Sequence, residues 1–170
     1  MILSGGVGTD FVGTLGTAAI TTILGQHVVE IGYVYTSDGS FAIGTSGTIM
    51  SSGPPTLPDH SRSVYLATYG QRITPQISAG GGFAWVDRTT NIKDAYIHQD
   101  PGFFSDGGSY WQHHSQMDSY PAAVVSLATN VRAYNWWGFQ FRAEVFASTR
   151  EVWGNMSVSI GLGNFPTDED

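Results

Sequence analysis

The sequence predicts an all-β protein, specifically an antiparallel β-sandwich of the jelly-roll type with one long aromatic-rich loop. Apolar and polar residues alternate with a period of two in several segments, which is typical of half-buried strands. Glycine, proline and asparagine separate these segments at short intervals, as turns do in sandwiches and barrels. Helix signals are weak, because no long segment has apolar residues at helical spacing, and lysine and glutamate are scarce.

The chain divides into three parts by composition. Residues 1–25 are rich in glycine and threonine and carry little charge, so we expect an N-terminal arm or a pair of edge strands there. Residues 26–165 hold the strand signals and form the expected sandwich domain. Residues 166–170 are an acidic tail.

In the first half of the sandwich domain, we expect short strands with turns between them. An Asp-Gly pair at residues 38–39 follows a segment rich in valine, isoleucine and tyrosine, and Asp-Gly is a strong hairpin signal. The expected strands are residues 27–35, 41–43, 63–69, 76–78 and 83–86.

In the second half, a long strand at residues 122–134 leads through a turn to two strands with clear alternation. Phe139, Phe141, Ala143 and Val145 alternate with polar residues, and residues 157–162 alternate in the same way. Glu144 falls on the polar face beside Arg142, where a cross-strand ion pair explains it better than a catalytic role does.

Two segments are predicted loops. Residues 51–63 contain three prolines, which a central strand does not tolerate, and residues 89–121 form a long loop with many aromatic residues. Aromatic faces and carboxylates in such a loop suit a glycan- or peptide-contacting surface, although the same aromatic residues also suit a small satellite core. The candidate contact residues are Tyr96, His98, Phe103, Phe104, Asp106, Tyr110, Trp111 and His113.

We expect no metal site and no cofactor. His113 and His114 point to opposite faces of an extended chain, so at most one of them reaches a shared site with His98. The adjacent residues Trp136 and Trp137 are instead candidates for an interface with a neighbouring subunit, because two tryptophans in one turn are hard to bury together.

The charge composition restricts the function classes. Only 12% of residues are charged, the formal net charge is −7, and no lysine or arginine precedes Arg62. An acidic chain is unlike a nucleic-acid binder, and the missing polybasic segment and long apolar run argue against a membrane partner. The absence of cysteine excludes disulfide scaffolds and Cys-ligated zinc. No catalytic motif is present, so we expect a protein that is not an enzyme.

Two short stretches, residues 35–41 and 66–77, resemble structural proteins of tailed-bacteriophage virions, namely small tail, fibre or capsid decoration proteins. The resemblance implies a non-enzymatic homo-oligomer that contacts other structural proteins of the assembly. It further implies that the chain assembles in the host cytoplasm and lies in the virion, with the long loop facing a host glycan or receptor.

Two alternatives remain open. Residues 155–165 resemble the closing strand of an outer-membrane β-barrel, which commonly ends in an aromatic residue such as Phe165, and this implies a bacterial outer-membrane location. The expected strands are short for a membrane barrel, and the N-terminus does not look like a signal peptide. The second alternative is a secreted lectin-like binding module with the same sandwich.

Overall fold

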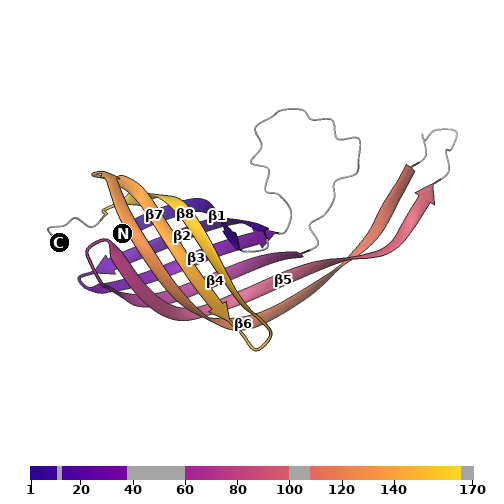
Figure 1. Cartoon of the computed structure of the whole chain (residues 1–170), viewed down its shortest axis with the longest axis horizontal. Helices are drawn as coiled ribbons and strands as arrows, with labels where there is room; N and C mark the ends of the chain where they lie inside the picture. The colour runs from indigo at the N-terminus through magenta and orange to yellow at the C-terminus, as the bar shows by residue number, and fades with distance from the viewer. Residues whose placement is uncertain (11–12, 38–59, 100–107, 166–170) are drawn as a thin grey trace.

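The chain forms a single closed β-barrel with a long hairpin at one end. A computed structural model describes residues 1–10, 13–37, 60–99 and 108–165. Short turns and both termini lie at one end of the barrel, and the hairpin extends from the other (Figure 1). The strands are β1 (Ile2–Asp10), β2 (Gly13–Leu24), β3 (His27–Ser37), β4 (His60–Arg72), β5 (Ile77–Gln99), β6 (Gly108–Tyr134), β7 (Trp137–Ala147) and β8 (Val152–Gly163).

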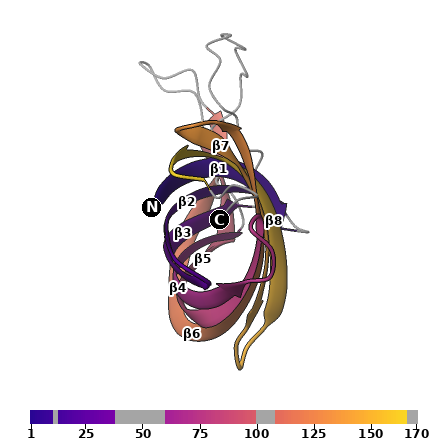
Figure 2. The same cartoon turned by 90° about the vertical axis from the view of Figure 1, so that its left-hand side faces the viewer.

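The ring closes because the first strand pairs with the last. Each strand pairs antiparallel with its neighbours in sequence, and β1 also pairs antiparallel with β8, from Ile2 opposite Gly163 to Asp10 opposite Asn155. Figure 2, which looks toward one end of the barrel, shows the ring. The expected all-β, antiparallel fold is confirmed, but the jelly-roll sandwich is replaced by one sheet closed on itself.

The strands are staggered around the ring. A path through directly paired residues that starts at Pro121 on β6 crosses β5, β4, β3, β2, β1, β8 and β7. It returns to β6 at Val131, further along the same strand. Such a stagger tilts the strands relative to the barrel axis, as closure requires. Residues 1–25, expected as an arm or edge strands, supply β1 and β2, which lie between β8 and β3.

The predicted strand at residues 27–35 lies in β3, and the one at 63–69 lies in β4. The predicted strands at 76–78 and 83–86 belong to one strand, β5, because the glycines between them stay in the sheet. A Cβ on Gly82 would lie 2.0 Å from the carbonyl oxygen of Ala67 on β4, and one on Gly70 would lie 2.3 Å from that of Ala79. Glycine therefore permits the close backbone approach of β4 and β5. The predicted strand at 41–43 lies outside the described residues.

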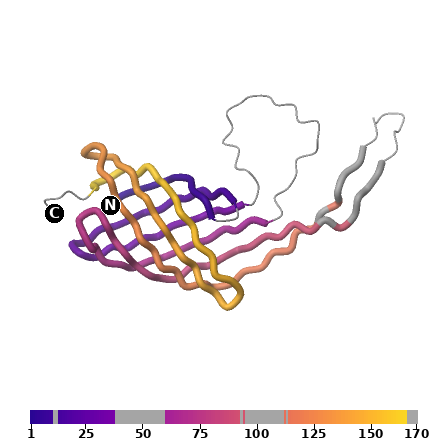
Figure 3. Tube along the Cα trace, in the orientation of Figure 1, coloured from indigo at the N-terminus to yellow at the C-terminus, as the bar shows by residue number. Residues whose placement is uncertain are grey.

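The predicted loop at residues 89–121 is wrong. Its backbone forms the outer parts of β5 and β6, which leave the barrel side by side (Figure 3) and pair with each other as far as Gln99 and Gly108 (Figure 1). Cross-strand pairing satisfies the backbone groups that an irregular loop would leave open.

The side chains inside the barrel form three layers. An apolar cluster lies between a charged cluster at the hairpin end and a mostly polar group of buried side chains toward the end with the termini. Phe165, beyond the end of β8, is buried and lies against Gly161 and Gly138, where added Cβ atoms would come within 2.7 and 3.0 Å of its ring. Phe165 therefore closes the barrel at the end where the termini lie. The apolar cluster comprises Leu15, Val34, Val64, Leu66, Ala84, Val86, Tyr120, Ala122, Val124 and Phe146.

Candidate functional site

The outer wall of the barrel is apolar, and its polar side chains face inward. On β7, Phe141 and Val145 are exposed, whereas Arg142 and Glu144 have only 4% and 1% of their surface exposed. The alternation predicted for this strand is therefore present, but the faces are the reverse of those of a protein with an apolar core. The exposed wall residues include Leu3, Val7, Ile20, Val29, Ile31, Phe83, Val125, Leu127, Phe141, Val145, Met156, Val158, Ile160 and Leu162.

An aromatic cluster lies on this wall toward the hairpin end. Tyr33, Tyr65 and Trp85 are direct cross-strand neighbours on β3, β4 and β5, and the two tyrosine rings are 5.2 Å apart. The Trp85 indole donates to Asp87 (3.1 Å), and the Tyr33 hydroxyl lies 3.1 Å from Ser63 Oγ. The polar atoms of Tyr33 and Trp85 therefore bond to residues that lie nearer the hairpin end, while the two rings lie on the apolar wall.

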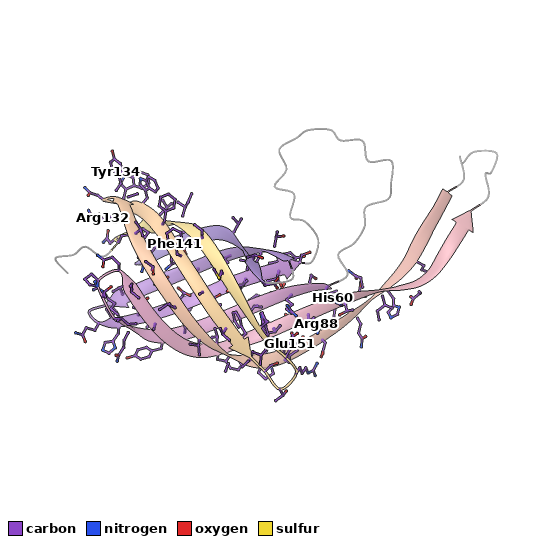
Figure 4. The ribbon with its side chains drawn as sticks, in the orientation of Figure 1. His60, Arg88, Arg132, Tyr134, Phe141 and Glu151 are labelled. Carbon is purple, nitrogen blue, oxygen red and sulfur yellow. The ribbon has the colours of Figure 1, made fainter. Side chains whose placement is uncertain are left out.

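Aromatic residues also gather at the opposite end. The Tyr69 hydroxyl lies 2.6 Å from His27 Nδ1, beside the β2–β3 turn. Trp137 stacks on Tyr134 with ring centroids 6.4 Å apart and contacts Phe139 edge-to-face at 5.5 Å. Figure 4 places Tyr134 at this end and Glu151 toward the other. The apolar wall is therefore bordered by aromatic residues at both ends.

No Asp, Glu, Lys or Arg side chain of the described strands faces outward between these two aromatic borders. Asp87 lies at the border itself, bonded to Trp85. Aromatic residues with an apolar body and a polar tip are typical of a boundary between hydrocarbon and water. This wall therefore suits an apolar surrounding medium. No helix among the described residues has the length and hydropathy needed to cross a membrane.

The polar side chains inside the barrel form a hydrogen-bonded network. Arg142 on β7 donates to Glu30 on β3 at 2.6 Å and to Gln140 at 2.8 Å. Thr21 donates to the same Glu30 oxygen at 2.9 Å, and Gln140 donates to Asn130 at 3.1 Å. A buried charge is stable only with such partners, so this network holds β2, β3, β6 and β7 together across the interior.

Packed side chains leave little space inside the described barrel. A cavity of about 20 Å³ lies beside Glu30 and Arg142, and one of about 40 Å³ lies near Arg62 and Arg88 at the hairpin end. The smaller volume is close to that of a single water molecule. The apolar cluster of the interior separates the two cavities, so they do not join into a wide channel.

A charged cluster lies at the hairpin end of the interior. Arg62 on β4 contacts Glu151 at 2.9 Å and Asp10 at 3.4 Å, Arg88 lies 3.7 Å from Glu151, and Tyr120 donates to Glu151. Burial works to raise the pKa of Glu151, but the Tyr120 hydrogen bond and the charges of Arg62 and Arg88 together hold that pKa below its usual value. The cluster fixes the β7–β8 turn to the strands across the barrel.

The predicted contact residues fall on the hairpin. Tyr96 and Trp111 are paired in backbone register across β5 and β6, and so are Lys93 and His113. Of the other candidates, His98 lies on β5 and Tyr110 on β6. Phe103, Phe104 and Asp106 lie outside the described residues.

The two predicted interface tryptophans lie at the β6–β7 turn. Trp136 is 62% exposed, whereas Trp137 is partly buried by its neighbours. The sequence did not single out Glu30, Gln140 or Asn130. The available signal was only that Gln140, Arg142 and Glu144 share one face of one strand, and a strand whose polar face is turned to water has the same pattern.

Comparison with known proteins supports the fold. No protein-family model and no curated protein sequence matches the chain. Among solved structures, the chain is similar to Ail, the attachment invasion locus protein of Yersinia pestis, in complex with the heparin analogue sucrose octasulfate. That likeness has a TM-score of 0.54 and 12% identity and covers 96% of each chain. The chain also resembles the N-terminal β-barrel domain of Pseudomonas aeruginosa OprF, with a TM-score of 0.48, 10% identity and 95% of each chain covered.

Ail is an outer-membrane β-barrel protein. The resemblance to bacteriophage virion proteins is therefore wrong, and so is the jelly-roll assignment that accompanied it. Residues 66–77 form the end of β4, a short turn and the start of β5, a local arrangement that does not by itself identify the fold.

Proposed function

We propose that this chain is an outer-membrane β-barrel protein whose barrel spans the bilayer and holds the β5–β6 hairpin outside the cell. The observation that carries the proposal is the reversal of faces: apolar side chains cover the outer wall, and charged side chains such as Arg142 lie inside. In water this arrangement would expose a large apolar surface, whereas in a bilayer it is the stable one.

The strand lengths support this proposal. β1 has 9 residues, β3 and β7 have 11, and β2 and β8 have 12. A tilted strand needs roughly 9–11 residues to cross the hydrocarbon core. The strands expected from the sequence were short because they included only the residues with the clearest alternation. In the structure, backbone pairing with neighbouring strands extends several of them. The low charge of the first two strands also fits, because their outer faces would meet lipid.

The orientation follows from the lengths of the connections. Barrels of this class have short turns on the periplasmic side and longer loops outside. The turns after β2, β4 and β6 are short and lie at the end with the termini, and the long hairpin lies at the other end (Figure 1). We therefore assign the termini to the periplasmic side.

The packed interior favours a role in anchoring over one in transport. The Arg142–Glu30 network and the apolar cluster fill the barrel, and the interior cavities of about 20 and 40 Å³ are too small for a solute such as a sugar. We assign the chain no catalytic reaction. Its role in this proposal is to present the hairpin surface outside the membrane.

Refolding tests the proposal. Urea-unfolded protein is diluted into phosphatidylcholine vesicles, into detergent micelles and into plain buffer, and folding is followed by circular dichroism and by migration of unheated samples on SDS gels. We expect folding with vesicles or micelles, flotation with the vesicles, and aggregation in buffer. A folded, soluble monomer in plain buffer would overturn the proposal.

A further inference from the structure

A furrow crosses the outer wall on the side of the barrel that β6, β7, β8 and β1 form. Its volume is about 390 Å³, compared with about 20 and 40 Å³ for the cavities inside the barrel. Every lining residue belongs to one of these four strands. Phe141, Met156 and Val158 line it and are 46%, 60% and 45% exposed, so the furrow opens to the surroundings of the barrel.

Strand register explains the shape of the furrow. Direct pairing aligns one row of outward residues across β1, β8, β7 and β6, namely Thr9, Met156, Ala143 and Leu127. A second row lies two residues away on each strand and consists of Val7, Val158, Phe141 and Thr129. Side chains two residues apart on a strand are separated by roughly 7 Å. The two rows therefore form parallel rims with a narrow gap between them.

The floor of the furrow is the row of paired residues between the rims, which comprises Gly8, Ser157 and Arg142. Gly8 has no side chain, and the Ser157 and Arg142 side chains are buried. Arg142 donates to Glu30 and Gln140 inside the barrel, so its charge is turned away from the furrow. Across four strands, at the usual strand spacing, the furrow is roughly 14 Å long.

The furrow offers little to a polar or charged ligand. The Thr9 hydroxyl donates to the backbone carbonyl of Gly13 at 2.8 Å, and none of the lining side chains that face outward is charged. A polar group brought here would lose its water without gaining a strong partner. A straight, narrow and apolar hollow suits an unbranched hydrocarbon chain.

We propose that this furrow binds one unbranched acyl chain of a phospholipid without net charge. The proposal rests on the proposed function, which turns the wall toward lipid. The furrow lies between the two aromatic borders, and lipid headgroups lie at the level of such borders. The furrow therefore recognises the chain and not the headgroup. The described strands carry no outward lysine or arginine between the borders, so the groups that would select an anionic lipid are missing there.

A chain in the furrow differs from the lipid that covers the rest of the wall. The two rims and the floor contact it on three sides, and dispersion attraction grows with the number of such contacts. The furrow runs across the strands, which are tilted by roughly 35–45° in closed barrels. A bound chain is therefore inclined to the membrane normal, whereas the surrounding chains are free to lie along it. We expect one chain per barrel to exchange more slowly than the others.

A second copy of this protein is a poorer occupant of the furrow. In a two-fold pair centred on the furrow, the same surface meets itself, so one hollow faces another. Neither copy then fills the space between them, and unfilled space forfeits packing contacts. An acyl chain fills the furrow without that restriction, and we assign the furrow to it.

Lipid retention tests the furrow. The protein is refolded in micelles that contain dipalmitoyl phosphatidylcholine, exchanged into lipid-free detergent, and released intact into a mass spectrometer. The competing probe is diphytanoyl phosphatidylcholine, which has the same headgroup but carries methyl branches along its chains. We expect one dipalmitoyl lipid per barrel and about tenfold less retention of the branched lipid, which is the size of effect that one misfitting group has in an apolar pocket.

Filling the furrow with protein should displace the lipid. Ala143 has the smallest side chain of the two rims, and a ring at this position would occupy the hollow. We expect Ala143→Phe to retain about tenfold less of the dipalmitoyl lipid while the gel migration of the barrel is unchanged. Ala18→Phe is the matched control, because Ala18 is exposed on β2 and does not line the furrow. This variant should retain the lipid as the wild type does.

The possible outcomes separate the furrow from the proposed function. No retention by the wild type, equal retention of the two lipids, or equal retention by the two variants overturns the furrow and leaves the membrane assignment intact. Dimers that exclude the lipid overturn the assigned occupant, because the wall then binds a second copy. Selective retention of the dipalmitoyl lipid in micelles by a chain that fails to float with vesicles supports the furrow and overturns the proposed function.

Discussion

Arg142 donates to Glu30 at 2.6 Å across the interior of the barrel, and both side chains are almost completely buried. The two residues are far apart in sequence and lie on β7 and β3, which are not neighbours in the ring. Their contact therefore depends on closure of the whole sheet, and it sets the polar network around it.

Removing one partner of this pair should be strongly destabilising. Arg142→Met leaves the carboxylates of Glu30 and Glu144 buried without a counter-charge, and we expect a loss of about 3–5 kcal/mol in the free energy of unfolding. Urea titration of the vesicle-inserted protein measures this loss. The double variant Glu30→Met/Arg142→Met should lose less than Arg142→Met alone, and equal or additive losses would contradict the role assigned to the pair.

The outer wall should reject charge at mid-strand. Val158 lies at the middle of β8 and is 45% exposed on the apolar wall. Val158→Arg should cost about 2–4 kcal/mol in a bilayer. Val152→Arg, at the hairpin end of the same strand, is the matched control and should cost about 0–1 kcal/mol. Similar costs at both positions in urea titrations from vesicles would argue against a membrane-facing wall.

Gly161 should be required for the position of Phe165. A Cβ at Gly161 would lie 2.7 Å from the ring of Phe165 and 2.8 Å from the side chain of Ile2. Gly161→Ala should therefore destabilise the barrel by about 1–3 kcal/mol through overpacking. Gly16→Ala, whose Cβ would meet nothing within 4 Å, is the control. The cost of Gly161→Ala should fall in a Phe165→Ala background, and an unchanged cost would exclude Phe165 as its cause.

The charged cluster at the hairpin end should make stability depend on pH in acid. The pKa of Glu151 is lower in the folded protein than the ordinary value of 4.5, despite the opposing effect of burial. Its contribution to stability is therefore complete above pH 4.5 and is lost as the pH falls through the lowered folded value. Unfolding free energies measured between pH 7 and pH 2.5 should fall less steeply in Glu151→Gln than in the wild type. An identical slope in the two proteins would rule out Glu151 as a source of the acid sensitivity.

The candidate surface was predictable only in part. The sequence predicts that aromatic residues between 96 and 113 form a contact surface on a loop. Their pairing across β5 and β6 depends on a strand register that local turn signals do not reveal. Glu144 was expected on a polar face beside Arg142, where a cross-strand ion pair would explain it. The two are 3.9 Å apart, but both are buried.

The sequence by itself determined that the chain is all-β, where several strands lie, and which residues of each strand share a face. Tertiary structure alone decided which face is inside. A strand that packs its apolar face into a core and a strand that turns that face to lipid both show a period of two. The pattern is therefore the same whether Phe141 or Arg142 faces the interior. Pairing of Ile2 with Gly163 closes the ring, and the sequence offered only the likeness of residues 155–165 to a closing strand as a sign of it. The low charge content, which in the sequence only restricted the function classes, is also what a wall facing lipid requires.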